Sequence, residues 1–201
     1  MTRWTFASRA LALLAGLAVA APVPADQDEA LVGAPAPGFA LRVLNAEAAG
    51  MSWLSLQSLV GDEPEDADAR VVLVSFFASW CAPCKKELPL LVELDTRYRS
   101  LGLRVIGVSI DREEDGIAAA RKLVADHHAA YPVLSDRFNL LARRYLGDQA
   151  PLPSVFLIGR DGKIISIERG YTRDAGGFLR ARVEAALGIK RTAAATGAKS
   201  R

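Results

Sequence analysis

The sequence predicts an α/β domain with a mixed central β-sheet flanked by helices. Two strongly apolar runs, 71–77 and 103–110, have the length and β-branched content of buried strands, and helix-period segments follow both. Near the C-terminal end, a third run, 154–158, is joined to 163–169 by a Gly-Arg-Asp-Gly turn, which is typical of a hairpin. Strands that alternate with helices and then end in a hairpin and a helix favour such a mixed sheet.

Composition and charge suit one globular domain with short extensions. The chain has 201 residues, of which 51% are hydrophobic and 24% are charged, and its formal net charge is +2. The basic excess lies near the two ends of the chain, so no nucleic-acid partner is expected. We expect the domain to span 26–188 and to be a monomer, and we expect the basic tail 189–201 to be disordered.

Residues 1–25 have the pattern of a secretory signal peptide. Arg3 and Arg9 form a positively charged start, an apolar stretch covers 10–21, and small residues precede two candidate cleavage positions. Cleavage there predicts a periplasmic or otherwise extracytoplasmic protein, whereas an uncleaved segment would anchor the N-terminus in a membrane. Export also fits an oxidisable cysteine pair, because disulfides persist outside the cytosol.

The region before the first central strand is predicted to hold a short N-terminal β-hairpin. Its strands would lie at 39–43 and 51–53, with the loop at 45–50, and one helical turn is expected at 55–60. The stretch 61–70 carries five acidic residues around a proline, which is the composition of a solvated loop.

The remaining elements follow from periodicity and from helix stop signals. Pro89 should kink the first long helix because it removes an internal hydrogen bond, and Asp111 is expected to cap the next helix. Phe138 and Phe178 are among the apolar positions through which the last two helices would pack. Helices are expected at 84–101, 113–128, 138–146 and 174–187, and a short strand at 131–134.

The only two cysteines, Cys81 and Cys84, lie where the first central strand ends and a helix begins. A thiol at a helix N-terminus meets unpaired N–H groups and the positive end of the helix dipole, so the pKa of Cys81 should be lowered. Cys84 lies one helical turn further and can close a disulfide with it. The pair can therefore cycle between dithiol and disulfide, which predicts a redox site.

Other uses of this pair fit the sequence less well. A disulfide that closes so short a loop removes only about 2 kcal/mol worth of chain entropy, so it would be a weak staple. Structural zinc needs a second pair of ligands, and haem attachment needs a histidine where Lys85 stands, so no metal and no cofactor are expected. A Cu(I) carrier that uses both thiolates remains an alternative, although the only histidines, His127 and His128, are not placed near the pair.

Residues 31–188 resemble the TlpA/ResA-like branch of the thioredoxin fold. The motifs that carry the resemblance are GAPAPGFAL near the start, WCAPCKKELP at the cysteines, VIGVSID in the second central strand and PLPSVFLIGRDGKI near the end. Members of this branch are secreted thiol–disulfide oxidoreductases, and they include reductants of cytochrome c maturation. The resemblance implies a thioredoxin-like fold with the N-terminal β-hairpin and a central αβ insertion, here 113–134.

The resemblance also implies roles for individual residues. Cys81 would be the exposed nucleophile and Cys84 the buried resolving thiol. The peptide bond before Pro153 would be cis, and the backbone beside it would form a groove for an extended substrate. The residues that would contact substrate are Trp80, Pro83, Leu152 and Pro153.

Glu87 matches an acid that some members of this branch place close to the cysteines. There it would accept or relay the proton of Cys84; taken alone, it would equally suit a solvated helix carboxylate beside Lys85 and Lys86. Thioredoxin carries a buried aspartate on the strand before the motif, and this chain has Ser75 instead. That departure favours Glu87 or water as the proton acceptor.

Together these inferences predict a protein-disulfide reductase that acts on disulfide-containing protein substrates and is re-reduced by a membrane thiol donor. A thiol peroxidase is one alternative, because it shares the opening motif, but peroxidatic sites carry Pro and Thr before the cysteine where this chain has 77–80, FASW. A net oxidant of the same fold is another, since the sequence does not fix the reduction potential.

Overall fold

The structure, a computed structural model, describes residues 26–149, 151–171 and 175–190, so the predicted signal 1–25 and the tail from 191 lie outside the described residues. The strands and long helices from residue 71 onward follow one another as the sequence predicts, whereas the short helices at 26–31 and 46–49 were not predicted. In order, the elements are α1 (Asp26–Leu31), β1 (Ala40–Arg42), α2 (Ala46–Ala49), β2 (Trp53–Ser55), η1 (Leu56–Ser58), β3 (Val71–Phe77), α3 (Ala82–Tyr98), η2 (Arg99–Leu101), β4 (Leu103–Ser109), α4 (Glu114–Asp126), β5 (Val133–Ser135), α5 (Leu140–Leu146), β6 (Ser154–Gly159), β7 (Ile164–Arg169) and α6 (Ala175–Ala186).

Five strands form a mixed central sheet in the order β5-β4-β3-β6-β7. β3 pairs with β4 in parallel and with β6 antiparallel; β4 and β5 are parallel, whereas β6 and β7 form an antiparallel hairpin. All seven residues of β3 are buried, as expected for a central strand covered on both faces. The predicted mixed α/β sheet is therefore confirmed.

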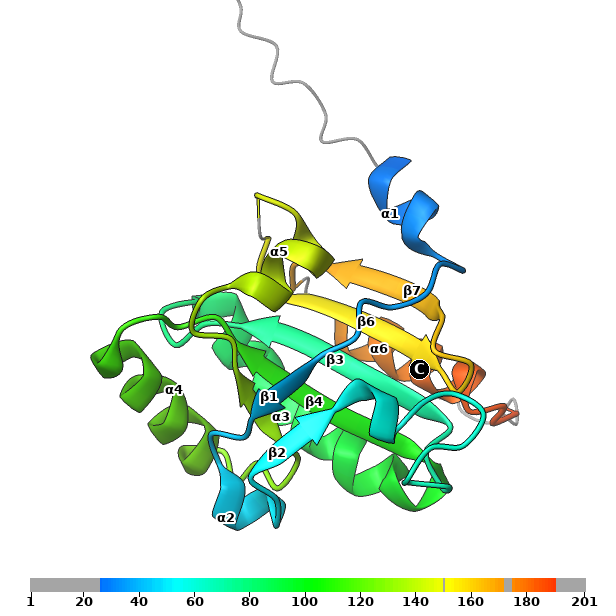
Figure 1. Cartoon of the computed structure of the whole chain (residues 1–201), viewed down its shortest axis with the longest axis horizontal. Helices are drawn as coiled ribbons and strands as arrows, with labels where there is room; N and C mark the ends of the chain where they lie inside the picture. The colour runs from blue at the N-terminus through cyan, green and yellow to red at the C-terminus, as the bar shows by residue number, and fades with distance from the viewer. Residues whose placement is uncertain (1–25, 150, 172–174, 191–201) are drawn as a thin grey trace, which may run out of the picture.

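Helices and the N-terminal hairpin cover the two faces of this sheet (Figure 1). α3 and α6 lie together behind it, where the Tyr98 hydroxyl donates a hydrogen bond to Glu184 (2.6 Å). The β1–β2 hairpin and α5 lie in front, and α4 flanks the β5 side. Because β3 and β4 are parallel, their C-terminal ends share one edge of the sheet, and α3 begins just after that edge.

An aromatic cluster attaches α5 to the front of the sheet. The rings of Phe76 on β3 and Phe156 on β6 both pack against Tyr145, with centroid separations of 5.2 and 4.9 Å. The Tyr145 hydroxyl also donates a hydrogen bond to the carbonyl of Pro37 (2.9 Å), just before β1. This contact holds the start of the hairpin beside α5.

The predicted N-terminal hairpin is confirmed, with β1 and β2 antiparallel and α2 in the connection between them. Its far end is joined to the edge strand of the sheet, since the backbone N–H of Leu44 donates to the carbonyl of Val133 (2.6 Å). The Asn45 side chain donates to the carbonyls of Ala129 and Tyr131. The hairpin is thus fixed at both ends.

The acidic stretch 61–70 is a loop without helix or strand, as its composition predicts, and four of its five acidic residues are exposed. Asp66 forms an ion pair with Arg104 of β4, and Arg160 donates hydrogen bonds to the carbonyls of Ala67 and Ala69. Ala69 itself is buried. Two arginines outside the stretch therefore fix it against the sheet, which its charge pattern alone did not reveal.

Two details of the predicted helices are wrong. Glu113 precedes α4 in the capping position, so Asp111 does not cap it. Phe138 and Phe178 are exposed, whereas other apolar positions of the same predicted helices are buried, among them Tyr145, Leu179 and Val183. α3 continues as one helix through Pro89, and the kink expected there stays a prediction.

Candidate active site

Cys81 and Cys84 form a disulfide at the start of α3, with their Cα atoms 5.3 Å apart. Cys81 occupies the N-cap position, and the backbone N–H of Cys84 donates a hydrogen bond to its Sγ (3.2 Å). Pro83 lies in the first turn, where the missing N–H of proline removes no intrahelical hydrogen bond. When the disulfide opens, the helix N-terminus stabilises a thiolate at Cys81.

Both sulfurs are largely covered in this oxidised form. Cys81 is 6% exposed and Cys84 is 1% exposed. Cys81 is thus the more accessible of the two, in agreement with the roles that the resemblance implies. It is nevertheless more shielded than an exposed nucleophile would be. The disulfide itself explains this, because it holds the Cys81 sulfur against the buried Cys84. Trp80, directly before the pair, is 70% exposed and provides the apolar surface of the site.

The Leu152–Pro153 peptide bond is cis, as the resemblance implies. The register of β6 against β3 sets Ser154 opposite Phe76, so Pro153 lies beside the end of β3, from which the chain continues to the cysteines. The backbone N–H of Gly170 donates to the Pro153 carbonyl (2.7 Å). The cis-proline loop and the disulfide therefore lie at the same edge of the sheet.

Arg169, at the end of β7, supports this loop. Its guanidinium binds both carboxylate oxygens of Asp28 on α1 and donates to the Ser154 hydroxyl (3.2 Å). That hydroxyl in turn donates to the carbonyl of Pro151 (2.7 Å). The sequence carries no local signal for this support, because Asp28 and Arg169 lie 141 positions apart in the chain.

Glu87 is buried within α3, with 4% of its surface exposed. The Ser75 hydroxyl, on the adjacent β3, donates a hydrogen bond to its carboxylate (2.9 Å). Glu87 lies three residues after Cys84 on the same buried side of the helix, whereas Lys85 and Lys86 are exposed. The alternative of a solvated helix carboxylate is therefore wrong.

The environment of Glu87 changes its acidity. Burial raises the pKa of Glu87 to about 7, because the ionised form loses hydration, and the hydrogen bond from Ser75 opposes part of that rise. Burial, followed by the nearby Glu87 charge, also raises the pKa of the Tyr131 hydroxyl. A carboxyl group that titrates near neutral pH is suited to exchange protons there.

Asp111 is a second buried carboxylate near the site, and it holds the segment that leads to the cysteines. It accepts hydrogen bonds from the backbone N–H of Ser79 (2.9 Å) and the Ser79 hydroxyl (2.7 Å). The hydroxyl of Ser109 donates a third (2.8 Å). The sequence feature that could have indicated this role is an acidic residue directly after a buried strand. The same feature also fits a helix cap, which is what the sequence predicted for Asp111.

The predicted site residues thus fall into two groups. The first lies at one edge of the sheet and consists of Trp80, Cys81, Pro83, Cys84, Leu152 and Pro153. Glu87 lies behind the cysteines, one helical turn into α3. A redox-active pair at a helix N-terminus, a neighbouring cis-proline loop and a buried acid together define a thiol–disulfide oxidoreductase of thioredoxin-like fold.

Comparisons with known proteins agree with this class. The chain belongs to the AhpC/TSA family, which it matches over residues 32–167. It is 28% identical over 141 residues to a thiol-disulfide oxidoreductase ResA of Bacillus cereus, covering 70% of this chain and 71% of the relative. The ResA protein of Oceanobacillus iheyensis is 28% identical over 171 residues, covering 84% and 82%.

A solved structure shows a similar arrangement. It is a crystal structure from Chlorobium tepidum described as a thiol:disulfide interchange protein DsbE, with 28% identity and a TM-score of 0.64. The match covers 78% of this chain and 98% of that one.

Within the part of the chain that the structure describes, no helix has the length and apolar character needed to span a membrane.

Proposed function

We propose that this protein is an extracytoplasmic protein-disulfide reductase of the cytochrome c maturation type. The observation that carries the proposal is the Cys81–Cys84 disulfide at a helix N-terminus, with the buried Glu87 behind it. The names of the ResA and DsbE relatives support thiol–disulfide exchange as the reaction. The signal pattern of 1–25 supports export, and N-terminal sequencing of the mature protein tests whether that segment is cleaved.

The reaction transfers two electrons to a substrate disulfide. The Cys81 thiolate attacks one substrate sulfur, which breaks the substrate disulfide, forms a mixed disulfide and releases one substrate thiolate. Glu87 accepts the proton of Cys84, whose thiolate then attacks the Cys81 sulfur. The second substrate thiolate leaves, and the Cys81–Cys84 disulfide re-forms. A membrane thiol donor restores the dithiol.

The substrate contacts follow from the geometry of the sheet edge. Trp80 offers an exposed indole directly before the pair, and the Leu152–Pro153 loop lies at the same edge of the sheet. Pro83, exposed in the first turn of α3, would border the entering chain. An extended segment of a protein substrate would lie between these groups.

Cysteine variants test the assignment directly. With insulin as substrate and an excess of dithiol, we expect Cys81→Ser to lose all reduction above the rate of the dithiol alone. With pre-reduced protein and no added dithiol, we expect Cys84→Ser to accumulate a mixed disulfide that mass spectrometry detects. The matched control is Ser100→Cys in the Cys81→Ser background, which restores the number of thiols at an exposed position away from the N-terminus of α3. Substantial insulin reduction by Cys81→Ser alone would reject the mechanism.

The direction of the reaction depends on the reduction potential of the pair. Equilibration with glutathione or thioredoxin buffers should give a value near or below about −270 mV, the range of thioredoxin. A value near about −120 mV would instead make the protein an oxidant and would exclude the maturation role.

Membership of the AhpC/TSA family keeps a thiol peroxidase as the second candidate. Here Cys81 is paired with a cysteine three residues away, and residues 77–80 lack the Pro and Thr that peroxidatic sites carry ahead of the cysteine. Peroxide consumption at a rate that exceeds insulin reduction would favour the peroxidase. Stoichiometric Cu(I) binding by the reduced form, lost in both Cys→Ser variants, would favour a copper carrier.

A further inference from the structure

The N-terminal segment 28–36 follows the outer edge of β7, which is an edge strand of the central sheet (Figure 1). The N–H of Gly33 donates to the carbonyl of Ile164 (2.8 Å), and the N–H of Ile164 donates to the carbonyl of Ala34 (3.0 Å). Leu31, the last residue of α1, packs against the hydrophobic core. Because the two segments run antiparallel, α1 continues toward the end of β7, where the cis-proline loop lies.

At the end of β7, Arg169 joins α1 to this loop. Its Nε and Nη2 groups donate hydrogen bonds to both carboxylate oxygens of Asp28 (2.6–2.9 Å), and its Nη1 group donates to the Ser154 hydroxyl (3.2 Å). The guanidinium also lies over the Phe156 ring, 5.5 Å from its centroid. These three partners fix the planar guanidinium in one orientation, which the single ammonium group of a lysine could not reproduce.

The carbonyl groups of the cis-proline loop are held by two hydrogen bonds among the described residues, and both lead back to this arginine. The Pro151 carbonyl accepts from the Ser154 hydroxyl (2.7 Å), which itself accepts from Arg169. The Pro153 carbonyl accepts from the N–H of Gly170 (2.7 Å), the residue after Arg169. Ser154 is fully buried, so water does not readily replace a lost partner of its hydroxyl. The conformation of the loop therefore depends on the position of Arg169.

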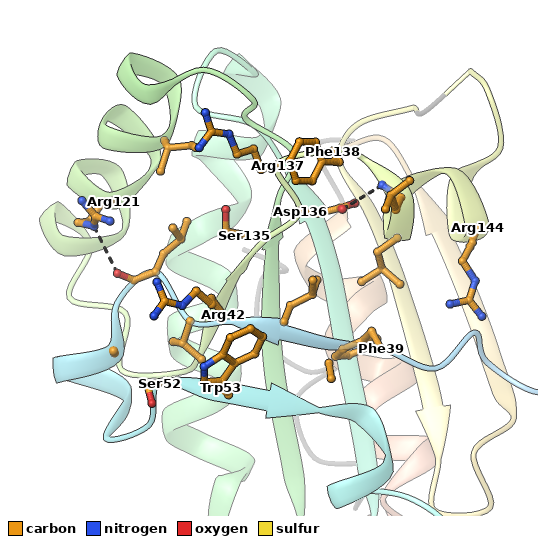
Figure 2. A pocket seen from close by; sticks show the side chains of 18 of the residues that line it. Phe39, Arg42, Ser52, Trp53, Arg121, Ser135, Asp136, Arg137, Phe138 and Arg144 are labelled. Carbon is orange, nitrogen blue, oxygen red and sulfur yellow. Dashed lines mark hydrogen bonds between the residues drawn. The ribbon is translucent and has the colours of Figure 1, made fainter.

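Two other arginines hold a different part of the fold, through backbone carbonyls. Arg121 and Arg144 lie at opposite ends of a groove of about 860 Å³ that β1, α4 and α5 border (Figure 2). Arg121 donates to the carbonyl of Leu44 (3.3 Å) and Arg144 to that of Gly38 (2.8 Å), so both hold the N-terminal hairpin. No lining residue of this groove belongs to the cysteine pair or to the cis-proline loop. Arg169 therefore acts where the substrate is expected, whereas these two arginines act on the hairpin.

From these contacts we propose that the Asp28–Arg169 pair positions the cis-proline loop, so that α1 sets how tightly protein substrates bind. The inference rests on the proposed reductase function, which assigns this loop to substrate binding. Within the described residues, neither side chain forms a hydrogen bond with the segment 79–84, so both act through the loop as positioning residues. An extended protein segment uses the loop, whereas a small disulfide needs only the Cys81 thiolate. Loss of the pair should therefore weaken protein substrates selectively.

The first test measures the loop itself in the oxidised protein, where no reaction takes place. Amide hydrogen exchange at Gly170 reports the opening of its hydrogen bond to Pro153, and the amides of β3 report global unfolding. We expect Asp28→Ala to speed exchange at Gly170 at least about tenfold relative to the β3 amides. Asp28→Asn, which keeps one acceptor oxygen, should speed it less. Unchanged exchange at Gly170 in both variants would overturn the proposal.

The second test separates substrate binding from chemistry. With insulin and an excess of dithiol, Asp28→Ala should raise KM at least about fivefold and leave kcat within about twofold of the parent. With hydroxyethyl disulfide, a small substrate, the pre-reduced variant should react at the rate of the parent. Equal losses with both disulfides, or an unchanged KM for insulin, would overturn the proposal.

The matched control is Asp66→Ala, which breaks an ion pair of similar exposure away from the loop. The side chains of Asp66 and Arg104 are 31% and 20% exposed, compared with 35% and 23% for Asp28 and Arg169. Arg104 lies near the start of β4, at the opposite edge of the sheet from the cysteines. Asp66→Ala should leave both the relative exchange at Gly170 and the KM for insulin within about twofold of the parent.

Two further outcomes are decisive. Effects of equal size in Asp66→Ala and Asp28→Ala would show a general loss of stability and would overturn the proposal. A parent protein that reduces hydroxyethyl disulfide but no insulin would instead reject the proposed function. The exchange rate at Gly170 would then decide alone whether the Asp28–Arg169 pair positions the loop.

Discussion

Two buried carboxylates lie near the cysteine-bearing segment, and they differ in how many hydrogen bonds they receive. Within the described residues, Glu87 accepts one side-chain hydrogen bond, from Ser75. Asp111 accepts three, two from Ser79 and one from Ser109. Burial disfavours an ionised carboxylate, and hydrogen-bond donors offset that penalty.

The difference supports the proposed division of tasks between them. Glu87, with a single donor and a pKa raised to about 7, is placed to exchange a proton behind the cysteines. Asp111 bridges the ends of β3 and β4 and fixes the backbone just before Trp80. A carboxylate with few donors serves proton transfer, whereas one with several donors serves position.

The largest effect is expected from Asp111→Ala. The substitution leaves three donors without their acceptor in a buried place, so we expect a loss of unfolding free energy on the order of 4 kcal/mol, measured by urea denaturation of the oxidised protein. Insulin reduction should fall as well, because the segment before Cys81 loses its attachment. Asp111→Asn, which keeps one acceptor oxygen, should lose less.

If Asp111→Ala and Asp111→Asn were as stable as the parent, the assignment of Asp111 as an anchor would be rejected. Exposed Asp115, four residues further on, provides the matched control. Asp115→Ala should change the unfolding free energy by no more than about 0.5 kcal/mol, as is usual for surface substitutions.

The next effect concerns Glu87→Gln and depends on pH. The pKa of Glu87 is about 7 in the folded protein and near 4.5 in the unfolded chain, so folding favours the protonated form. Its contribution to stability is fully present below about pH 4.5 and is lost as pH rises through 7. Relative to the parent, Glu87→Gln should therefore gain stability on the order of 3 kcal/mol between pH 5 and pH 9.

Urea denaturation of both oxidised proteins across this pH range measures the difference. Glu93→Gln, on the exposed side of the same helix, is the control and should show a nearly flat difference. A flat difference for Glu87→Gln too would show that Glu87 titrates in the acid range and would remove it as a proton acceptor for Cys84.

The strand, the helix and the cysteine pair were predictable from the sequence, but the environments of Glu87 and Asp111 were not. The apolar run of β3 and the cysteine spacing predicted the strand, the helix and the redox pair, because burial and helix periodicity act locally. Whether Glu87 lies inside or outside depends on the exact rotation of α3 against the sheet, and its neighbours Lys85 and Lys86 suggested the outside. Asp111 was mistaken for a helix cap because a cap and a cross-strand acceptor carry the same residue type.

The surroundings of β1 show the same limit at longer range. The hairpin was predicted from its turn and apolar residues, but the groove beside it is completed by α4 and α5, more than 70 residues further along the chain. Arg121 and Arg144 carried no signal in the sequence, because an arginine on a helix is usually a solvated surface residue. Only the packing of these helices beside β1 brings the two side chains to the strand edge.

The smallest effect separates the two serine hydroxyls. Ser75 donates to Glu87 and Ser109 to Asp111, so Ser75→Ala and Ser109→Ala remove the same chemical group from the two carboxylates. Because the Ser75 hydrogen bond favours the ionised form, Ser75→Ala should raise the pKa of Glu87 further. The midpoint of the pH-dependent stability loss should then move upward by about one pH unit, on the order of 1.4 kcal/mol. Ser109→Ala should leave this midpoint in place, since Ser109 does not contact Glu87. Equal shifts in both variants would mean that the pH dependence of stability reports a general loosening of the sheet edge.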